Sequence, residues 1–197
     1  MSLEATINVA HWLPRSQANG PGTRFVLWTQ GCPLACPGCW NPDTWSTESR
    51  TLMSVDEILA LIDEATLIEG VTLSGGEPFA QSAVLVQLAS AVRDRGLSRM
   101  AFTGYELCEL TSPDQQALLK LLDIVITGRF VAAQKRSDLL WRGSSNQVVH
   151  FLTDRYRQGD HEEAVAVEVA LDGRGGARVT GFPPHSLLVQ LRTGRAS

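Results

Sequence analysis

The chain has 197 residues, of which 44% are apolar and 19% charged, so it is long and apolar enough to fold around a hydrophobic core. This composition excludes a disordered or fibrous protein. A net charge of -4 argues against nucleic acid as a partner. The chain has no apolar run of about 20 residues and no signal-peptide pattern at its start, so we expect a cytoplasmic protein without membrane contact.

The first predicted element is a strand at residues 24–29, which follows a Gly-Pro-Gly turn and is rich in β-branched and aromatic residues. Ser54 and Glu57 then form a capping-box pattern, and the apolar residues that follow repeat at helical spacing. A second strand is predicted at residues 71–74. It ends in the sequence Gly-Gly-Glu-Pro at residues 75–78.

A second helical pattern stops at Gly96, and a third strand is predicted at residues 99–103. Ser112 and Pro113 are typical of the start of a helix, and residues 123–127 form a fourth apolar run. The alternation predicts an α/β fold with a parallel sheet and helices packed outside it, either open or curled into part of a barrel.

The loops that follow the four predicted strands are expected to meet at one rim of the sheet, because the carboxyl ends of parallel strands lie on the same edge. They are the cysteine-containing loop after the first strand, the Gly-Gly-Glu-Pro loop, and the loops at Gly104-Tyr105 and Gly128-Arg129.

The pattern changes towards the C-terminus. Residues 161–171 alternate apolar and polar side chains, a glycine-rich turn follows, and residues 177–182 form a returning strand, which together predict a β-hairpin. A further short strand is predicted at residues 187–191. We therefore divide the chain into a core domain at residues 1–151 and a C-terminal β-hairpin extension at 152–197, packed on the core.

Three of the four cysteines, Cys32, Cys36 and Cys39, form a CxxxCxxC pattern. In a reducing compartment such close spacing is typical of metal ligation, not of a disulfide framework. A [4Fe-4S] cluster ordinarily takes four cysteines, so three would leave one iron open to another ligand. The alternative is a single zinc ion, which needs a distant fourth ligand. The candidates for that ligand are His11, His150 and His161.

Other candidate residues have simpler interpretations. Cys108 lies among helical spacings, and we expect it to be a small buried side chain. The three histidines have no partner at ligand spacing, so we expect surface or structural roles for them. The Gly-Gly-Glu-Pro sequence alone would most often be a tight turn.

The cysteine pattern followed by Gly-Gly-Glu-Pro resembles the radical S-adenosylmethionine (SAM) superfamily. Longer strings between residues 19 and 150 resemble, in order, those of the activating enzymes of anaerobic ribonucleotide reductase. These strings are NGPGTRFVLWTQGCPLACPGCWNPDTW, TLSGGEPF, FTGYELCEL, DIVITGRF and LLWRGSSNQVVH. The resemblance implies a partial (β/α) barrel of the radical SAM type, here with a small C-terminal β appendage.

The resemblance also implies a [4Fe-4S] cluster held by Cys32, Cys36 and Cys39, which makes these the catalytic residues. SAM would bind the open iron, and reduction would cleave it to a 5′-deoxyadenosyl radical. Glu77 would accept a hydrogen bond from the methionine ammonium group. The other SAM-binding candidates are Gly75, Gly76, Pro78, Trp40, Tyr105, Arg129, Ser144 and Asn146.

Three of these assignments come with qualifications from the residues themselves. For Trp40 and for Tyr105, packing within the protein is an interpretation as good as contact with a ligand. Arg129 stands where relatives have a lysine near the SAM carboxylate, but Thr127 replaces the aspartate of the same family pattern, which removes a carboxylate.

The function that the resemblance implies is the generation of a glycyl radical on a partner enzyme, with an electron from a flavodoxin- or ferredoxin-like donor. An alternative is a radical SAM enzyme that modifies a peptide or a small molecule. The C-terminal extension favours that alternative, because the short activating enzymes end near the GSSNQ string. A third class is a non-enzymatic zinc or iron–sulfur protein.

Overall fold

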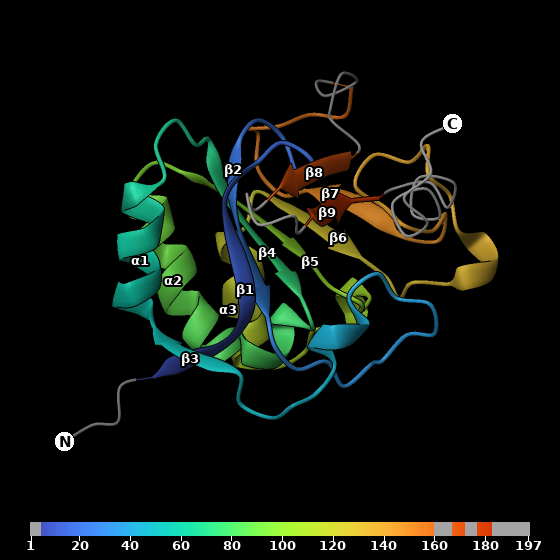
Figure 1. Cartoon of the computed structure of the whole chain (residues 1–197), viewed down its shortest axis with the longest axis horizontal. Helices are drawn as coiled ribbons and strands as arrows, with labels where there is room; N and C mark the ends of the chain where they lie inside the picture. Colours follow the sequence, from blue (N-terminus) through green and yellow to red (C-terminus); the bar gives the residue numbers. More distant parts are fainter. Residues whose placement is uncertain (1–4, 160–166, 172–176, 183–197) are drawn as a thin grey trace.

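The computed structural model describes residues 5–159, 167–171 and 177–182. Within these residues, seven strands form one mixed sheet in the order β3-β1-β2-β4-β5-β6-β7 (Figure 1). Its four central strands are parallel to one another, as the alternation of strands and helices predicts. They are β2 (Arg24–Thr29), β4 (Gly70–Gly75), β5 (Ser98–Phe102) and β6 (Ile124–Thr127).

Antiparallel strands flank this parallel centre on both sides. They are β1 (Thr6–Ser16) and β3 (Thr51–Ser54) on one side and β7 (Val148–Phe151) on the other. None of the three is among the predicted strands. β1 contains Pro14 and two irregularities in its pairing with β2, between Val9 and His11 and between Leu13 and Ser16, which interrupt the regular alternation of a strand.

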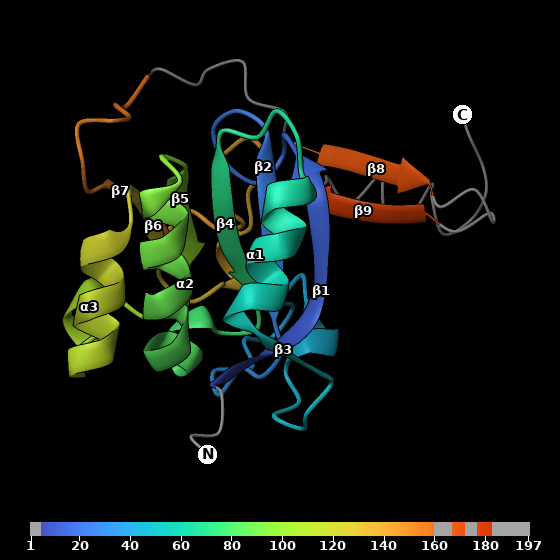
Figure 2. The same ribbon diagram turned by 90° about the vertical axis from the view of Figure 1, so that its left-hand side faces the viewer.

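The described helices pack on one face of the sheet, where they enclose the main hydrophobic core (Figure 2). They are α1 (Val55–Glu64), α2 (Ser82–Asp94) and α3 (Pro113–Leu121). The predicted capping box at Ser54 is present, since Ser54 accepts from Glu57 N–H at 3.2 Å. The helix start predicted at Ser112 is also a capping box, with Ser112 accepting from Gln115 N–H at 3.2 Å. None of these helices is long and apolar enough to cross a membrane.

Short 3₁₀ turns and a separate hairpin complete the described structure. The turns are Pro42–Thr44, Pro78–Gln81, Leu107–Glu109 and Ala132–Gln134. The hairpin pairs β8 (Val167–Leu171) with β9 (Ala177–Gly181) in antiparallel register and lies on the side of the sheet away from α1 and α2 (Figure 1). The rest of the predicted hairpin, at residues 161–166, and the predicted strand at 187–191 lie outside the described residues. The two-domain division stays a prediction.

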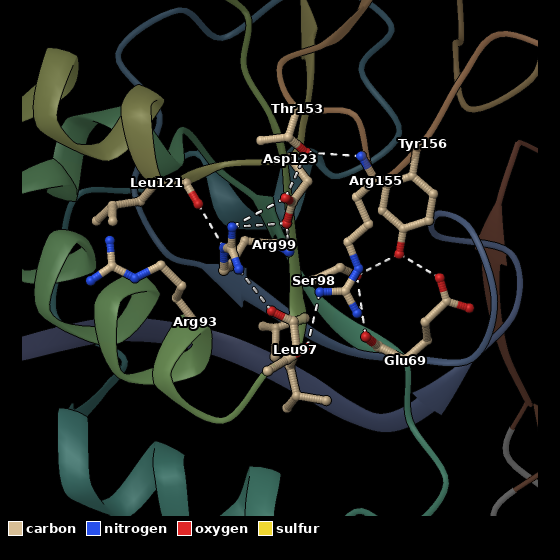
Figure 3. A network of polar contacts seen from close by, with 12 residues as sticks. Glu69, Arg93, Leu97, Ser98, Arg99, Leu121, Asp123, Thr153, Arg155 and Tyr156 are labelled. Carbon is tan, nitrogen blue, oxygen red and sulfur yellow. Dashed lines mark hydrogen bonds and ion pairs between the residues drawn. The ribbon is translucent and has the colours of Figure 1, made fainter.

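The chain that follows β7 is tied to the amino ends of the parallel strands (Figure 3). The Tyr156 hydroxyl, which is buried, donates to the carboxylate of Glu69 and lies within hydrogen-bond distance of Ser98 Oγ, at 2.7 Å. Thr153 donates to Asp123 Oδ1 at 2.9 Å. These bonds fix the direction in which the chain leaves the sheet towards the hairpin.

We predict that Tyr156→Phe lowers the free energy of unfolding by about 1–2 kcal/mol, because the hydrogen bonds between its buried hydroxyl and Glu69 and Ser98 are lost. Urea denaturation under reducing conditions measures the change. Tyr105→Phe is the matched control, since the contacts of Tyr105 are made by its ring and backbone. An equal loss of stability in both variants would contradict the role given to the Tyr156 hydroxyl.

Candidate functional site

The loops after the four parallel strands meet at one rim, as the topology predicts, and open into a cavity of about 480 Å³. This volume is within the range of small-molecule pockets. The rim residues that line it are Cys32, Cys36 and Cys39 after β2, Gly75 at the end of β4 with Gly76 and Glu77 after it, Thr103 and Gly104 after β5, and Gly128 after β6.

The cysteine loop turns tightly and is held by backbone hydrogen bonds. Gly31 N–H donates to Thr44 O at 2.8 Å, and Cys32 N–H donates to Trp45 O at 3.1 Å. Within the loop, Cys39 N–H donates to Cys36 O at 3.0 Å. All three cysteines are free and half-buried. The loop therefore presents three thiols to one cavity.

Backbone N–H groups surround two of the thiols. Asn41 N–H donates to Cys39 Sγ at 3.5 Å. Burial raises the pKa of the Cys32 thiol, and hydrogen bonds from the backbone of Ala35 and Leu34 act in the opposite direction by favouring the thiolate. Donors of this kind also tune iron–sulfur clusters through their ligand sulfurs. The loop thus has the chemistry of a cluster-binding loop.

A single-ion site is not formed by the described residues, since no three of their His, Cys, Asp and Glu side chains lie close enough to hold one metal ion. Thiolates on one zinc ion would be about 3.8 Å apart, because each lies about 2.3 Å from the metal in a tetrahedron. Thiolates on a four-iron cluster bind separate irons and lie further apart. Three thiols that do not converge on one ion are compatible with a cluster, whose thiolate ligands bind separate irons.

The Gly-Gly-Glu-Pro loop packs directly on the cysteine loop. Gly76 N–H donates to Thr29 O at 2.8 Å, and Glu77 N–H donates to Gly31 O at 2.9 Å. A Cβ on Gly76 would lie 2.3 Å from Gly31 O, and one on Gly75, whose φ is 101°, would lie 2.5 Å from Thr29 N. Glycine is required here because two backbones approach closely.

Glu77 joins this loop to the loop after β5. Its side chain is 1% exposed. One carboxylate oxygen accepts from Phe79 N–H and from the Thr103 hydroxyl, both at 2.9 Å, and the other accepts from Gly104 N–H at 2.8 Å. Burial raises the pKa of Glu77 to about 7, although these three donors favour the charged form.

Trp40 lines the cavity next to the cysteines. The Lys135 ammonium lies 4.3 Å from the centre of its ring, in cation–π geometry. Its Nε1 is buried and has no hydrogen-bond partner in the described part of the chain. The Trp40 ring is thus held by Lys135 on one face, and its Nε1–H donor is not used by any described residue.

Five of the SAM-binding candidates are not among the described residues that line the cavity. The five candidates are Pro78, Tyr105, Arg129, Ser144 and Asn146. Arg129 forms a two-point ion pair with Glu109 at 2.7 and 2.8 Å. The Ser144 hydroxyl accepts from Val131 N–H, and Asn146 donates to Arg129 O.

Neighbours of these residues reach the cavity instead. From the same two strings, Gly128, Phe130, Gly143 and Gln147 line it. Both strings therefore contribute to the cavity lining, through residues next to those named from the sequence.

Three further residues line the cavity without having been predicted to do so, although the sequence offered His11 as a candidate zinc ligand. His11 on β1 and Trp28 on β2 line it with stacked rings 4.4 Å apart, and Asn19 lines it between these strands. No local motif marks His11. Its position could have been found only by recognising β1 as a strand paired with β2.

Cys108 corrects one expectation, because it is exposed and not buried. It lies in the single 3₁₀ turn Leu107–Glu109 at the surface, where the following Leu110 is the buried residue. His150 has a structural contact, with Nε2 3.0 Å from the Thr127 hydroxyl. His161 lies outside the described residues.

A family model described as a 4Fe-4S single cluster domain matches residues 18–150. The anaerobic ribonucleoside-triphosphate reductase-activating protein of Vibrio cholerae is 39% identical over 155 residues, which cover 75% of this chain and 99% of that protein. The protein of the same name from Escherichia coli K12 is 36% identical over 154 residues, covering 74% of this chain and 99% of the relative. The chain belongs to this family of activating proteins.

Among solved structures, QueE from Escherichia coli is similar over 52% of this chain and 53% of its own, with a TM-score of 0.40 and 20% identity. This partial overlap adds nothing to the assignment, which rests on the family model and on relatives matched over almost their whole length.

We predict that the cluster-free protein becomes less stable as pH rises from about 4.5 to 7. The folded state binds a proton at Glu77 in this range, where the pKa in the folded protein is about 7 against 4.5 for the unfolded chain. The loss is up to about 3 kcal/mol, because each pKa unit is worth about 1.4 kcal/mol. The contribution of Glu77 to the free energy of unfolding is fully present below pH 4.5, the pKa of this carboxyl in the unfolded chain.

Urea denaturation of reduced protein at several pH values measures this loss, with Glu77→Gln as the comparison. Glutamine does not titrate, so the variant should lack the component of pH dependence that Glu77 supplies. Parallel pH profiles of the two proteins would show that the Glu77 carboxyl does not titrate in this range.

Proposed function

We propose that this chain is a radical SAM activating enzyme that cleaves SAM reductively and generates a glycyl radical on a partner enzyme of the anaerobic ribonucleotide reductase type. The observation that carries the proposal is the three-cysteine loop, packed by backbone hydrogen bonds on the Gly-Gly-Glu-Pro loop at one cavity. Membership of the family of activating proteins supports the choice of partner.

In this proposal Cys32, Cys36 and Cys39 hold a [4Fe-4S] cluster and leave one iron for SAM. When bound, the cluster and SAM together supply the electron and the radical that removes a hydrogen atom from the substrate. The protein holds the three thiolates on a loop rich in backbone donors and shields them within the cavity. This division of labour leaves positioning and exclusion of water to the chain.

Glu77 is suited to the methionine ammonium group. A carboxylate has about four lone-pair sites, and protein donors fill three of them in this residue. Because Glu77 lines the cavity, we propose that a ligand donor takes the fourth site. A bound ammonium would favour the charged carboxylate and offset the cost of its burial.

Trp40 is the second residue proposed to contact SAM. It lies beside the cysteines at the cavity, and its buried Nε1 donor lacks an acceptor among the residues that the structure describes. An acceptor on the nucleoside would satisfy it. We propose for Pro78, Tyr105, Arg129, Ser144 and Asn146 a less direct role, which is to hold the loops whose neighbours line the cavity.

Three further parts of the proposal follow from the chemistry of the family. The mixed sheet would be the partial barrel of the radical SAM type. A flavodoxin- or ferredoxin-like protein would supply the electron. The cytoplasm is the proposed location, because its reducing conditions keep the cluster thiols free.

A radical SAM enzyme that modifies a peptide or a small molecule is the second candidate. One observation favours it: residues of the β8–β9 hairpin, which lies beyond the family-model match at 18–150, line the cavity. A different cavity wall is compatible with a different substrate.

We predict that Cys36→Ala loses both the cluster and SAM cleavage, since removing one of three thiolates leaves too few ligands. Iron and sulfide content and visible absorbance of anaerobically reconstituted protein measure the first loss. The formation of 5′-deoxyadenosine with dithionite measures the second. Cys108→Ala is the matched control, because that thiol is exposed outside the cavity, and should retain both. An intact cluster in wild-type protein without 5′-deoxyadenosine would leave only a binding role.

The partner is tested by electron paramagnetic resonance. We expect a persistent carbon-centred doublet when reconstituted protein, SAM and reductant are mixed with an anaerobic ribonucleotide reductase. SAM cleavage without such a signal, but with conversion of a peptide or small molecule, would favour the second candidate.

A further inference from the structure

The β8–β9 hairpin contributes residues to the same cavity as the cysteine loop. Four consecutive residues at its end, Val179, Thr180, Gly181 and Phe182, line the same cavity as the three cysteines. Figure 1 shows the hairpin on the face of the sheet that α1 and α2 leave uncovered. The family model ends at residue 150, so this wall lies outside the part of the chain that it matches.

Two side chains anchor the hairpin to the segment after β1. The Glu168 carboxylate accepts from the Ser16 hydroxyl and from Gln17 N–H, the latter at 2.9 Å. Asn19 Nδ2 donates to Thr180 Oγ1 and to Ser16 Oγ, both at 2.8 Å. Ser16, Asn19 and Thr180 are buried, so these bonds are protected from water.

The anchor continues into the centre of the sheet. The Thr72 hydroxyl on β4 donates to Asn19 O at 2.8 Å. The same hydroxyl accepts from Nε of the fully buried Arg24 on β2 at 2.6 Å. A continuous chain of hydrogen bonds thus runs from two central strands to the hairpin, which makes the hairpin part of the folded core and not a loose appendage.

Phe182 provides an apolar contact at the end of the hairpin. Its ring lies 6.1 Å from that of Phe102 at an angle of 51°, and both residues line the cavity. Phe182 also packs against a second core cluster on this face of the sheet. The buried members of that cluster are Met100, Ile124, Ile126, Trp141 and Tyr156.

We infer that the β8–β9 hairpin is a specificity-determining wall of the cavity, with Thr180 and Phe182 as the residues that set which substrate group can lie opposite the cluster. The inference deepens the proposed function and rests on it. A wall at this place excludes water and bulky groups from the space between SAM and the substrate. The hydrogen atom is then taken from the intended carbon and not from another donor.

The inference is tested by measuring how many molecules of 5′-deoxyadenosine are formed for each glycyl radical. When hydrogen transfer is confined to the substrate, each 5′-deoxyadenosine formed corresponds to one glycyl radical. Phe182→Ala opens the wall, and Thr180→Val removes the acceptor of Asn19 without a large change in volume. We expect each variant to form at least about three times more 5′-deoxyadenosine per glycyl radical than wild type, because a less enclosed site permits side reactions.

Two matched controls separate the wall from general effects of substitution. Thr180→Ser keeps the hydroxyl and should retain the wild-type ratio. Val169→Ala changes the same hairpin at a side chain that is 43% exposed and does not line the cavity, and it should also behave as wild type. Wild-type coupling in both Phe182→Ala and Thr180→Val would overturn the inference, as would equal uncoupling in Val169→Ala.

Hydrogen exchange provides a readout without turnover. Reconstituted wild-type protein is compared with and without SAM in the absence of reductant, and we expect slower amide exchange at residues 179–182 when SAM is present. Unchanged exchange in protein that binds SAM would overturn the wall but leave the proposed function intact. Wild-type protein that neither binds nor cleaves SAM would overturn both.

Discussion

Parallel pairing of β2 with β4 continues beyond the ends of both strands, and the arrangement of the cavity depends on this continuation. Backbone bonds from Gly76 to Thr29 and from Glu77 to Gly31 join the cysteine loop to the Gly-Gly-Glu-Pro loop. The two motifs, which are separated in sequence by a helix, thereby become one backbone unit. The glycines serve first to let these backbones meet, and any contact with a ligand builds on that geometry.

The parallel centre of the fold could be predicted because its signals are local. The buried strands are continuous apolar runs, and the helices at Ser54 and Ser112 begin with capping boxes. β1, β3 and β7 were missed. β1 pairs in antiparallel fashion with two partners, contains Pro14 and has two irregularities in its pairing. Its apolar and polar residues therefore do not alternate regularly, and regular alternation is the pattern by which a strand is recognised in a sequence.

The candidate site could be predicted in part for the same reason. The cysteine spacing and the strand-end positions of the loops are local features, and the described cavity brings them together. Which groups Arg129 and Asn146 bind depends instead on residues that only the tertiary fold brings near them. Arg129 forms an ion pair with Glu109, and neither residue lines the cavity. His11, Asn19 and Phe182 come together from distant parts of the chain, and no short pattern encodes such a meeting.

The bond between Ser16 and Glu168 spans 152 positions of the chain, which has a consequence for the order of folding. Contacts of such long range form late, because the intervening chain must first be closed into a loop. During synthesis the parallel strands and the cysteine loop emerge well before Glu168 and Thr180. The nascent protein therefore has an interval in which the cavity already has its loops from the parallel strands but still lacks the residues that the hairpin contributes, from Val179 to Phe182.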